Sequence, residues 1–321
     1  MGAVAAAVAV GAVAEEADAE VVAVDDLRLN TDRCKSAAKT WIGGLPRLGV
    51  GLGFRRPLAG EILSHAAEID FLEIISEHYL NPTGFEDREL RELGRRFQLI
   101  PHGLSLSPGT AEPVKKDYAR AVGRLVDRVQ APWWSDHLAM TRSGRIDIGH
   151  LAPIPLTEEM LEIVCDNIKQ ARSEVAAPFI IENIAYTLRM PGAEMGEAEF
   201  LSRVVEATDS GLLLDLMNLH ANSRNHGYDP YEFLAAIPLE RVVQVHIIGG
   251  HYHHGVLIDS HSHRTPDEVW RLLEFVARRT EIKAVLIEWD EEFPDFGVIL
   301  EELAQAREVL SRRDEATYVG A

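Results

Sequence analysis

The chain has 321 residues, of which 46% are hydrophobic, and a formal net charge of −19. This length and hydrophobic content are sufficient for one large core, while the strong negative charge disfavours a nucleic-acid partner because it repels phosphate backbones. The two distant cysteines, Cys34 and Cys165, exclude a disulfide framework and a thiolate zinc site. No apolar run is long enough to span a bilayer, so we expect a protein of a reducing compartment, the cytoplasm, without a membrane partner.

Residues 1–45 differ in composition from the rest of the chain. An Ala/Val-rich run is followed by an acidic block and then by the segment that contains Cys34. Basic residues that precede the apolar core of an export signal are missing here. We therefore predict a flexible or partner-contacting extension. The acidic block before Cys34 leaves open a second interpretation, a fused substrate with a leader and a cysteine-bearing core.

From residue 48 onward, short apolar runs alternate with helical patterns, including those at 58–68, 118–129, 157–175, 197–208 and 266–279. Apolar strands that are each followed by a helix indicate a parallel sheet buried on both faces. Eight such units close a barrel. We predict an α/β fold over 46–321, a (β/α)₈ TIM-type barrel that is xylose-isomerase-like. The strand-like runs are 48–53, 70–76, 97–103, 132–137, 178–183, 211–218, 242–248 and 284–287.

Two connections in the second half of the chain are long. Residues 221–233 and 249–264 both lack a clear helical or strand pattern, and we predict irregular loops there. Loops after barrel strands lie on the face that carries the active site in this architecture, so both should shape a substrate site. The run 301–316 is expected to form a last helix that packs on the barrel.

Six of the eight strand-like runs end at an imidazole or a carboxylate, and a barrel brings such ends to one mouth. Buried together, these groups need cations to neutralise them. Nitrogen and oxygen ligands without thiolates suit iron, manganese or zinc. Glu182 lies centrally in the order and could bridge two ions, with Asp259 and His261 above the mouth. The strand-end residues are His102, His137, Glu182, Asp215, His246 and Glu288.

A set of motifs in fixed order gives a family resemblance. Between residues 48 and 300 the chain resembles the multinuclear non-haem iron-dependent oxidative enzymes, with the methanobactin-maturation oxidase as the type. Singly the motifs are weak, but together they are specific. They are GVGLGFR (49–55), EHYL (77–80), IPHGLSLS (100–107), SDHLA (135–139), IIENIAYTL (180–188), LLLDLMN (212–218), NHGYDP (225–230), QVHIIGG (244–250), LIDSHS (257–262) and LIEWD (286–290).

The resemblance implies an oxidoreductase that binds two or three iron ions in mixed Fe(II)/Fe(III) states and uses O₂ as co-substrate. Its expected substrate is a residue, most commonly cysteine, of a ribosomally synthesised precursor peptide. Family members usually act with a separate protein that captures the peptide leader, so a leader-recognition partner is expected as well. Glu182, Asp215, His246 and Glu288 are the expected catalytic set. By position, His102, His137 and Glu182 would hold one iron, Glu182, Asp215, His246 and Glu288 the second, and Asn218, Asp259 and His261 the third.

Two departures from the family pattern concern histidine. The methanobactin-type enzyme has histidine where Asn218 stands, and a weak carbonyl ligand would make the third site labile. His220, in the run LMNLH, has no counterpart that places it. His251, His253 and His254 are also additional, and we interpret them as loop or substrate contacts.

Other functions remain open at this point. Sugar isomerases and abasic-site endonucleases share strand-end His, Glu and Asp clusters on metal-dependent barrels. The acidity of this chain disfavours an endonuclease, and no strand ends in the lysine that a sugar isomerase would normally place near its metals. A different class of protein is a non-catalytic peptide-binding scaffold in which the metals are structural.

Overall fold

The computed structural model describes residues 41–319, and the side chains of residues 41–312. These residues fall within one compact unit, Lys39–Ala321. The predicted extension over 1–45, with its acidic block and Cys34, lies almost entirely outside the described residues, so its flexibility and its possible role as a fused substrate stay predictions. Within the described residues, no helix combines the length and the hydrophobicity that crossing a bilayer requires.

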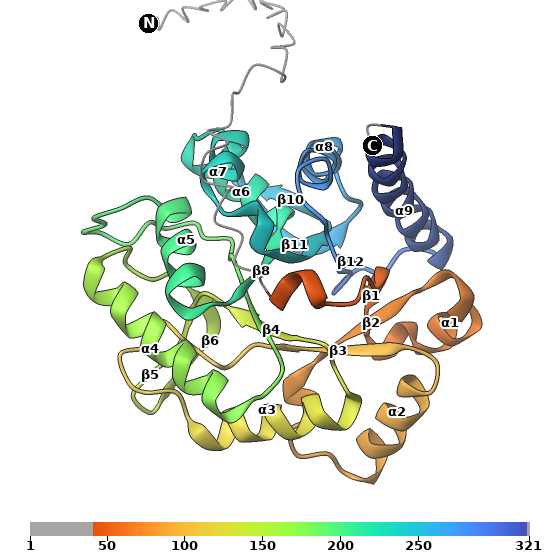
Figure 1. Cartoon of the computed structure of the whole chain (residues 1–321), viewed down its shortest axis with the longest axis horizontal. Coiled ribbons are helices and arrows are strands. Elements are labelled where there is room, and N and C mark those ends of the chain that lie inside the picture. The colour runs from red at the N-terminus through yellow and green to blue at the C-terminus, as the bar shows by residue number, and fades with distance from the viewer. Residues whose placement is uncertain (1–40, 320–321) are drawn as a thin grey trace, which may run out of the picture. The chain divides into compact units, whose positions relative to one another are not determined.

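Eight parallel strands close into a barrel, as the sequence predicts (Figure 1). Their order around the ring is β1-β12-β9-β8-β7-β4-β3-β2, so each strand of the ring lies beside its neighbour in sequence, and the last strand pairs with the first. Two additional two-stranded hairpins interrupt the strand numbering. The barrel strands are β1 (Gly49–Gly53), β2 (Phe71–Ile75), β3 (Gln98–Gly103), β4 (Trp134–His137), β7 (Phe179–Glu182), β8 (Gly211–Asp215), β9 (Val242–Ile247) and β12 (Ala284–Ile287).

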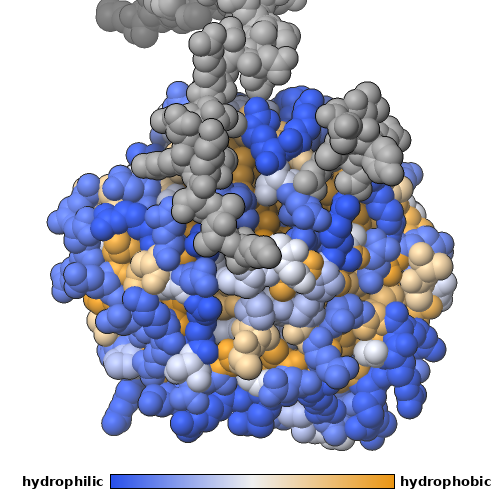
Figure 2. Space-filling model, viewed as in Figure 1, coloured by the Kyte–Doolittle hydropathy of each residue, from blue (hydrophilic) through white to orange (hydrophobic). Residues whose placement is uncertain are grey.

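Helices surround the ring of strands (Figure 1). Several begin where the sequence offers a cap: the Thr157 side chain accepts a hydrogen bond from Met160 at the start of α4, and Thr83 with Glu86 forms a capping box at the start of α2. Hydrophilic side chains dominate the face shown in Figure 2. The helices are α1 (Ala59–Ser64), α2 (Gly84–Gly94), α3 (Lys116–Val129), α4 (Glu158–Glu174), α5 (Glu197–Thr208), α6 (Leu216–His226), α7 (Pro230–Ala236), α8 (Asp267–Ala277) and α9 (Phe296–Val319).

An apolar layer fills the amino-terminal half of the barrel interior. It is a separate core cluster, to which nearly every strand contributes a residue. Because side chains of a strand alternate between faces, the residue two positions further along also points inward. That next interior position holds Glu73 after Phe71, His102 after Ile100, Glu182 after Ile180, Asp215 after Leu213 and Glu288 after Leu286. This alternation places the ionisable side chains next to the apolar layer, on the side of the carboxyl ends of the strands.

The prediction of an irregular loop over 221–233 was wrong. Helix α6 begins directly after β8, because Asp215 turns the chain and its Oδ1 accepts a hydrogen bond from Asn218 N at 2.6 Å. Helix α7 follows, with Asp229 as N-cap and Pro230 in the first turn. The apolar run 211–218 therefore joins a five-residue strand to the first turn of a helix.

The expected loop over 249–264 is also regular in structure. It forms an antiparallel hairpin of β10 (Gly249–His253) and β11 (Val256–His263). Its turn residues, His254 and Gly255, have φ of 48° and 84°, the left-handed conformation that two-residue hairpin turns favour. A second hairpin, β5 (Met140–Ser143) with β6 (Ile146–Ala152), follows β4 and had no sequence prediction.

Candidate metal centre

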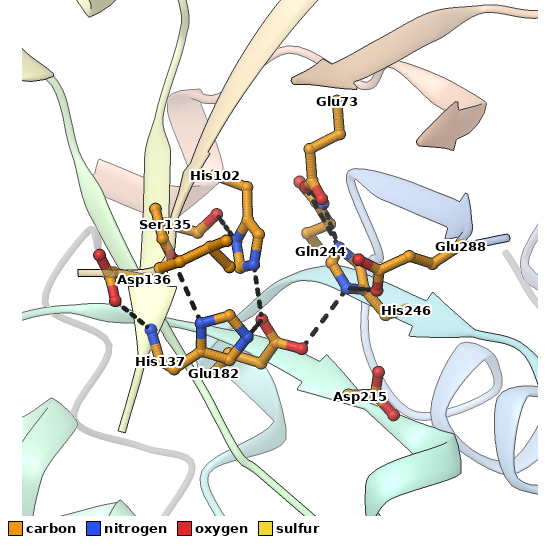
Figure 3. Close-up of polar contacts among 12 residues, drawn as sticks. Glu73, His102, Ser135, Asp136, His137, Glu182, Asp215, Gln244, His246 and Glu288 are labelled. Atoms are coloured by element: carbon orange, nitrogen blue, oxygen red, sulfur yellow. Dashed lines mark hydrogen bonds and ion pairs between the residues drawn. The ribbon is translucent and has the colours of Figure 1, made fainter. Parts of the chain in front are cut away.

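One group of candidate ligands comes from three barrel strands. His102, His137 and Glu182 each offer one ligand atom, and these atoms lie within 4.8 Å of one another. Glu182 Oε2 lies 3.4 Å from His102 Nε2 and 3.3 Å from His137 Nε2 (Figure 3). The opposite ring nitrogens are held by the protein, since His102 Nδ1 lies 2.8 Å from Ser135 Oγ and His137 Nδ1 lies 3.2 Å from the Gly103 carbonyl. Both rings therefore present Nε2 toward the same point, as metal-bound histidines do.

A second group shares the same glutamate. Glu182, Asp215, His246 and Glu288 offer ligand atoms within 4.8 Å of one another, and all four are buried. His246 Nδ1 lies 2.9 Å from Glu288 Oε2 and 3.5 Å from Glu182 Oε1. The two oxygens of Glu182 thus face different groups, and Figure 3 shows this carboxylate between the two histidines on one side and His246 on the other. This is the arrangement that a bridging carboxylate requires.

The residues expected at a third site are placed differently. His261, on β11, groups with Glu288 and Asp290. Its Nδ1 lies 2.9 Å from Asp290 Oδ2, and its Nε2 lies 2.8 Å from Asp259 Oδ2. His261 also has φ of 49°, a left-handed conformation that is uncommon for non-glycine residues. Asn218 lies on α6, where its Nδ2 donates to the Asn183 carbonyl at 3.0 Å.

Several buried ligand atoms of this cluster make no hydrogen bond within the described part of the chain. Native proteins satisfy nearly all buried polar atoms, so a concentration of unsatisfied oxygens needs an explanation. In each of these residues, the other polar side-chain atom contacts a protein partner or faces the cluster. The free oxygen therefore remains available to bind a metal ion. The donor set, nitrogen and oxygen without sulfur, fits iron, manganese or zinc. The free atoms are Glu182 Oε2, Asp215 Oδ2, Asn218 Oδ1 and Asp259 Oδ1.

The charges of the cluster are strongly coupled. Burial alone would lower the pKa of His246. The neighbouring carboxylates of Glu73, Glu288 and Glu182 outweigh burial and raise this pKa well above its ordinary value. Burial and the neighbouring Asp259 and Glu182 raise the pKa of Asp215 well above its usual range. Both shifts have the same cause, which is the crowding of carboxylates in a buried site. A bound cation would relieve this repulsion.

Sequence reasoning missed a supporting chain beneath the centre. Gln244 Oε1 accepts a hydrogen bond from Trp133 Nε1 at 2.8 Å, and Gln244 Nε2 donates to Glu73 Oε2. His246 Nε2 lies 3.1 Å from the same glutamate oxygen. Glu73 is 3% exposed and lies in mid-strand, whereas the residues predicted from the sequence lie at strand ends. Its signal in the sequence is a carboxylate at an interior position of the apolar run DFLEIIS.

Arg55 was also missed. It follows β1 and lies against Glu288, with Nη2 3.3 Å from Oε1, and its guanidinium also pairs with Asp290. Burial disfavours the charged guanidinium, but Asp290 and Glu288 outweigh it and raise the pKa of Arg55. Arg55 thus fixes the outer oxygen of Glu288 while the inner one faces His246. It is the last residue of the GVGLGFR motif.

The remaining histidines stand apart from these groups. His220 lies on α6 and is buried, and burial lowers its pKa. His251, His253 and His254 lie on the exposed β10–β11 hairpin, where the rings of His253 and His254 are 4.2 Å apart. None of the four belongs to the ligand groups found among the described residues.

Comparison with known proteins decides the family. Residues 49–311 match the model of a family described as RiPP precursor modification enzyme MbnB/TglH/ChrH. The chain belongs to this family. The expectation of an enzyme that modifies a ribosomally made peptide is thereby confirmed at family level. The ligand groups described above show separately that the chain has residues that could bind metal.

Relatives are similar over most of the chain, and solved structures share its fold. A "UPF0276 protein" of Caulobacter vibrioides is 38% identical over 268 residues, 83% of this chain and 96% of the relative. One from Rhizorhabdus wittichii is 36% identical over 270 residues, 84% of this chain and 97% of the relative. A D-tagatose 3-epimerase-like protein has a TM-score of 0.53 at 17% identity, covering 84% of this chain and 99% of its own. A D-psicose 3-epimerase from Clostridium cellulolyticum has a TM-score of 0.50 at 11% identity, covering 83% and 98%. At such identities the last two show the fold alone, and they confirm the xylose-isomerase-like barrel.

Proposed function

We propose that this enzyme is an iron-dependent oxidase of the multinuclear non-haem type, which uses O₂ to oxidise a cysteine of a ribosomally synthesised precursor peptide. The observation that carries the proposal is Glu182, whose two buried oxygens face separate sets of ring nitrogens. A carboxylate shared in this way, in a site without sulfur ligands, supports two adjacent hard or borderline metal ions. Membership of a peptide-modifying family supports the substrate class.

The ligand assignment follows the two compact groups. His102, His137 and Glu182 would hold one iron, and Glu182, Asp215, His246 and Glu288 would hold the second. A third ion would use His261 with Asp259 and Asn218, or with Glu288 and Asp290, since His261 approaches both sets. Bound iron would supply redox capacity and a site for O₂. The ligand groups for two ions are already assembled, and the position of a third would depend on the orientation of the His261 ring.

The protein's own contribution is orientation and charge. Each histidine has its outer ring nitrogen held by the protein: His102 by Ser135, His137 by the Gly103 carbonyl and His246 by Glu73. Each ring therefore turns its remaining nitrogen inward. Arg55 holds the outer oxygen of Glu288. Residues oriented in this way need little rearrangement when they bind a metal.

The expected partners are a precursor peptide and a separate leader-recognition protein. The two hairpins, β5–β6 and β10–β11, follow β4 and β9, so both lie on the face where the metal ligands converge. β10–β11 also carries the candidate ligands Asp259 and His261. A peptide would therefore approach between elements that are also part of the metal centre.

Metal analysis and oxygen consumption test the proposal. After anaerobic loading with Fe(II) and desalting, we expect two or three iron ions per chain. A cysteine-containing peptide encoded beside the gene should then trigger O₂ uptake and a mass change at its cysteine. Retention of one zinc per chain with no iron, or peptide binding without O₂ uptake, would contradict an oxidase.

A further inference from the structure

Beside the metal centre lies an apolar cavity of about 430 Å³ that the proposed chemistry does not use. Its walls come from the segment after β6, from residues 184–196 after β7, and from α5 and α7, which pack side by side (Figure 1). Its volume lies in the range of small-molecule and side-chain sites. It is larger than any single side chain needs, so it has space for a bulky side chain with part of its main chain.

The cavity reaches residues next to the metal ligands on two strands. Leu138 and Asn183 are part of its lining, and each directly follows a candidate ligand, His137 and Glu182. Neighbouring residues are separated by about 3.8 Å between Cα atoms. A ligand in the cavity is therefore within a few residues' reach of a group held at the metals.

The lining is mostly apolar, and one of its polar groups has no partner among the described residues. Tyr228 Oη is buried and has no hydrogen-bond partner among the described residues. Its neighbours are already committed, since Tyr186 Oη donates to Glu197 at 2.7 Å and Tyr186 stacks on His226 at 4.7 Å. A buried hydroxyl without an acceptor is rare in native proteins. This one points to a ligand that brings a hydrogen-bond acceptor.

The outer end of the cavity is open and hydrophobic. Leu188 is 73% exposed and Met190 is 38% exposed, and both line the cavity. Exposed apolar side chains that continue into a cavity are typical of a binding site rather than of a solvated loop.

We infer that this cavity binds a bulky apolar residue of the precursor peptide, one to three positions from the residue that is oxidised, with Tyr228 Oη donating a hydrogen bond to a peptide carbonyl of that segment. The inference rests on the proposed peptide-oxidising function. It adds a sequence requirement to the substrate: a large aliphatic or aromatic residue close to the modified cysteine.

Binding of small capped amino acids to the full-length protein tests this without iron or O₂. We would titrate N-acetyl-L-phenylalaninamide and N-acetylglycinamide into iron-free protein and follow binding by ligand-observed NMR. Burial of the phenyl ring should make the first probe bind about tenfold more tightly than the second. Equal binding of the two probes would overturn the inference.

Two variants locate the probe. Ala198→Trp, which fills the cavity from α5, should abolish the preference for the phenylalanine probe, while Ala304→Trp, a matched change at an exposed position of α9, should keep it. Tyr228→Phe preserves the shape of the cavity and should weaken both probes several-fold, because each carries the peptide carbonyl. Unchanged binding in both cavity variants would place the probe elsewhere and overturn the inference.

The two proposals fail separately. Selective probe binding in a protein that retains no iron would refute the oxidase and leave the cavity as a side-chain site. The opposite outcome would use a peptide in which glycine replaces the apolar residues beside the cysteine. If the protein retained iron and oxidised this peptide with O₂ at an unchanged KM, the cavity's role would be refuted and the oxidase would stand.

Discussion

Glu182 has two buried oxygens that face different histidines. Its loss should therefore affect metal binding more than the loss of any other acid of the centre. Glu182→Ala removes a ligand from both proposed sites and leaves three histidines facing a void. We expect iron content to fall below one ion per chain and peptide oxidation to be lost. Asn218→Ala removes one candidate ligand oxygen and the hydrogen bond to the Asn183 carbonyl, and it should lower occupancy of one ion. Parallel metal analysis and turnover assays of the two variants compare them, and equal losses would contradict the ranking.

Glu73 is expected to position His246 rather than to bind metal or substrate. Its Oε2 contacts both Gln244 Nε2 and His246 Nε2 in a fully buried site. Glu73→Ala would leave these groups unpaired, at a cost of about 1–3 kcal/mol in the free energy of unfolding. Glu73→Gln should keep the fold and the iron but change the iron's Mössbauer parameters, because the ring of His246 loses its charged partner. A Gln variant with an unaltered spectrum would contradict the positioning role.

Glu197 gives the protein a pH dependence that is independent of metal. Burial raises the pKa of Glu197 from 4.5 to about 7, despite the hydrogen bond from Tyr186 and the nearby Arg189. Between these values the folded state binds a proton that the unfolded state has released, so stability falls as pH rises through this window. Glu197→Gln cannot titrate, and its melting temperature relative to the native chain should rise from pH 4.5 to 7 and then stay level. A constant difference across that range would contradict the raised pKa.

At the level of elements, most of the barrel could be predicted because strands and helices differ in the period of their apolar residues. The predicted run 197–208 coincides with α5, and all eight strands were located. The errors have physical causes. Asp215 caps α6 while it ends β8, so one residue belongs to two elements, and an apolar run cannot show the junction. Hairpin pairing over 249–264 depends on partners from the other strand, which polar, histidine-rich segments do not reveal.

The candidate site was predictable for a related reason, and only in part. Strand ends of a parallel barrel converge by topology, so His102, His137 and Glu288 could be found from position alone. Glu73 and Arg55 support the centre from mid-strand and from the chain after β1, where position carries no such signal. The partners of His261 depend on the hairpin's register, which only the structure gives.

The hairpin that carries His261 depends on close approach of its two strands. A Cβ at Gly250 would lie 2.0 Å from the Ile258 carbonyl oxygen and 2.8 Å from Met217 Cε. Gly250→Ala should therefore displace β10 from β11, expose the hairpin to limited proteolysis and lower iron occupancy near His261. Gly60→Ala, on α1, is the control, because a Cβ there meets no described atom within 4 Å. Equal protease resistance in both variants would show that the hairpin tolerates the change.

For the molecule as a whole, the buried acids matter more than the surface charge. The net charge is −19, but solvent and salt screen the charges on the helices. The acids inside the barrel mouth are not screened, and the iron-free protein has to fold around their mutual repulsion. Metal binding should therefore be coupled to the stability of the whole barrel.

Melting temperature is the measurement that reports this coupling. A ligand at about a thousand times its dissociation constant stabilises a protein by about 4 kcal/mol, which corresponds to roughly 6 °C in a chain of this size. Anaerobic Fe(II) loading should raise the melting temperature by about this amount in the native chain and in Glu61→Ala, which removes an exposed carboxylate of α1. Glu182→Ala should gain much less, because it lacks the carboxylate that both proposed sites share. If iron shifted Glu182→Ala as much as the native chain, the bound metal would lie outside the barrel mouth.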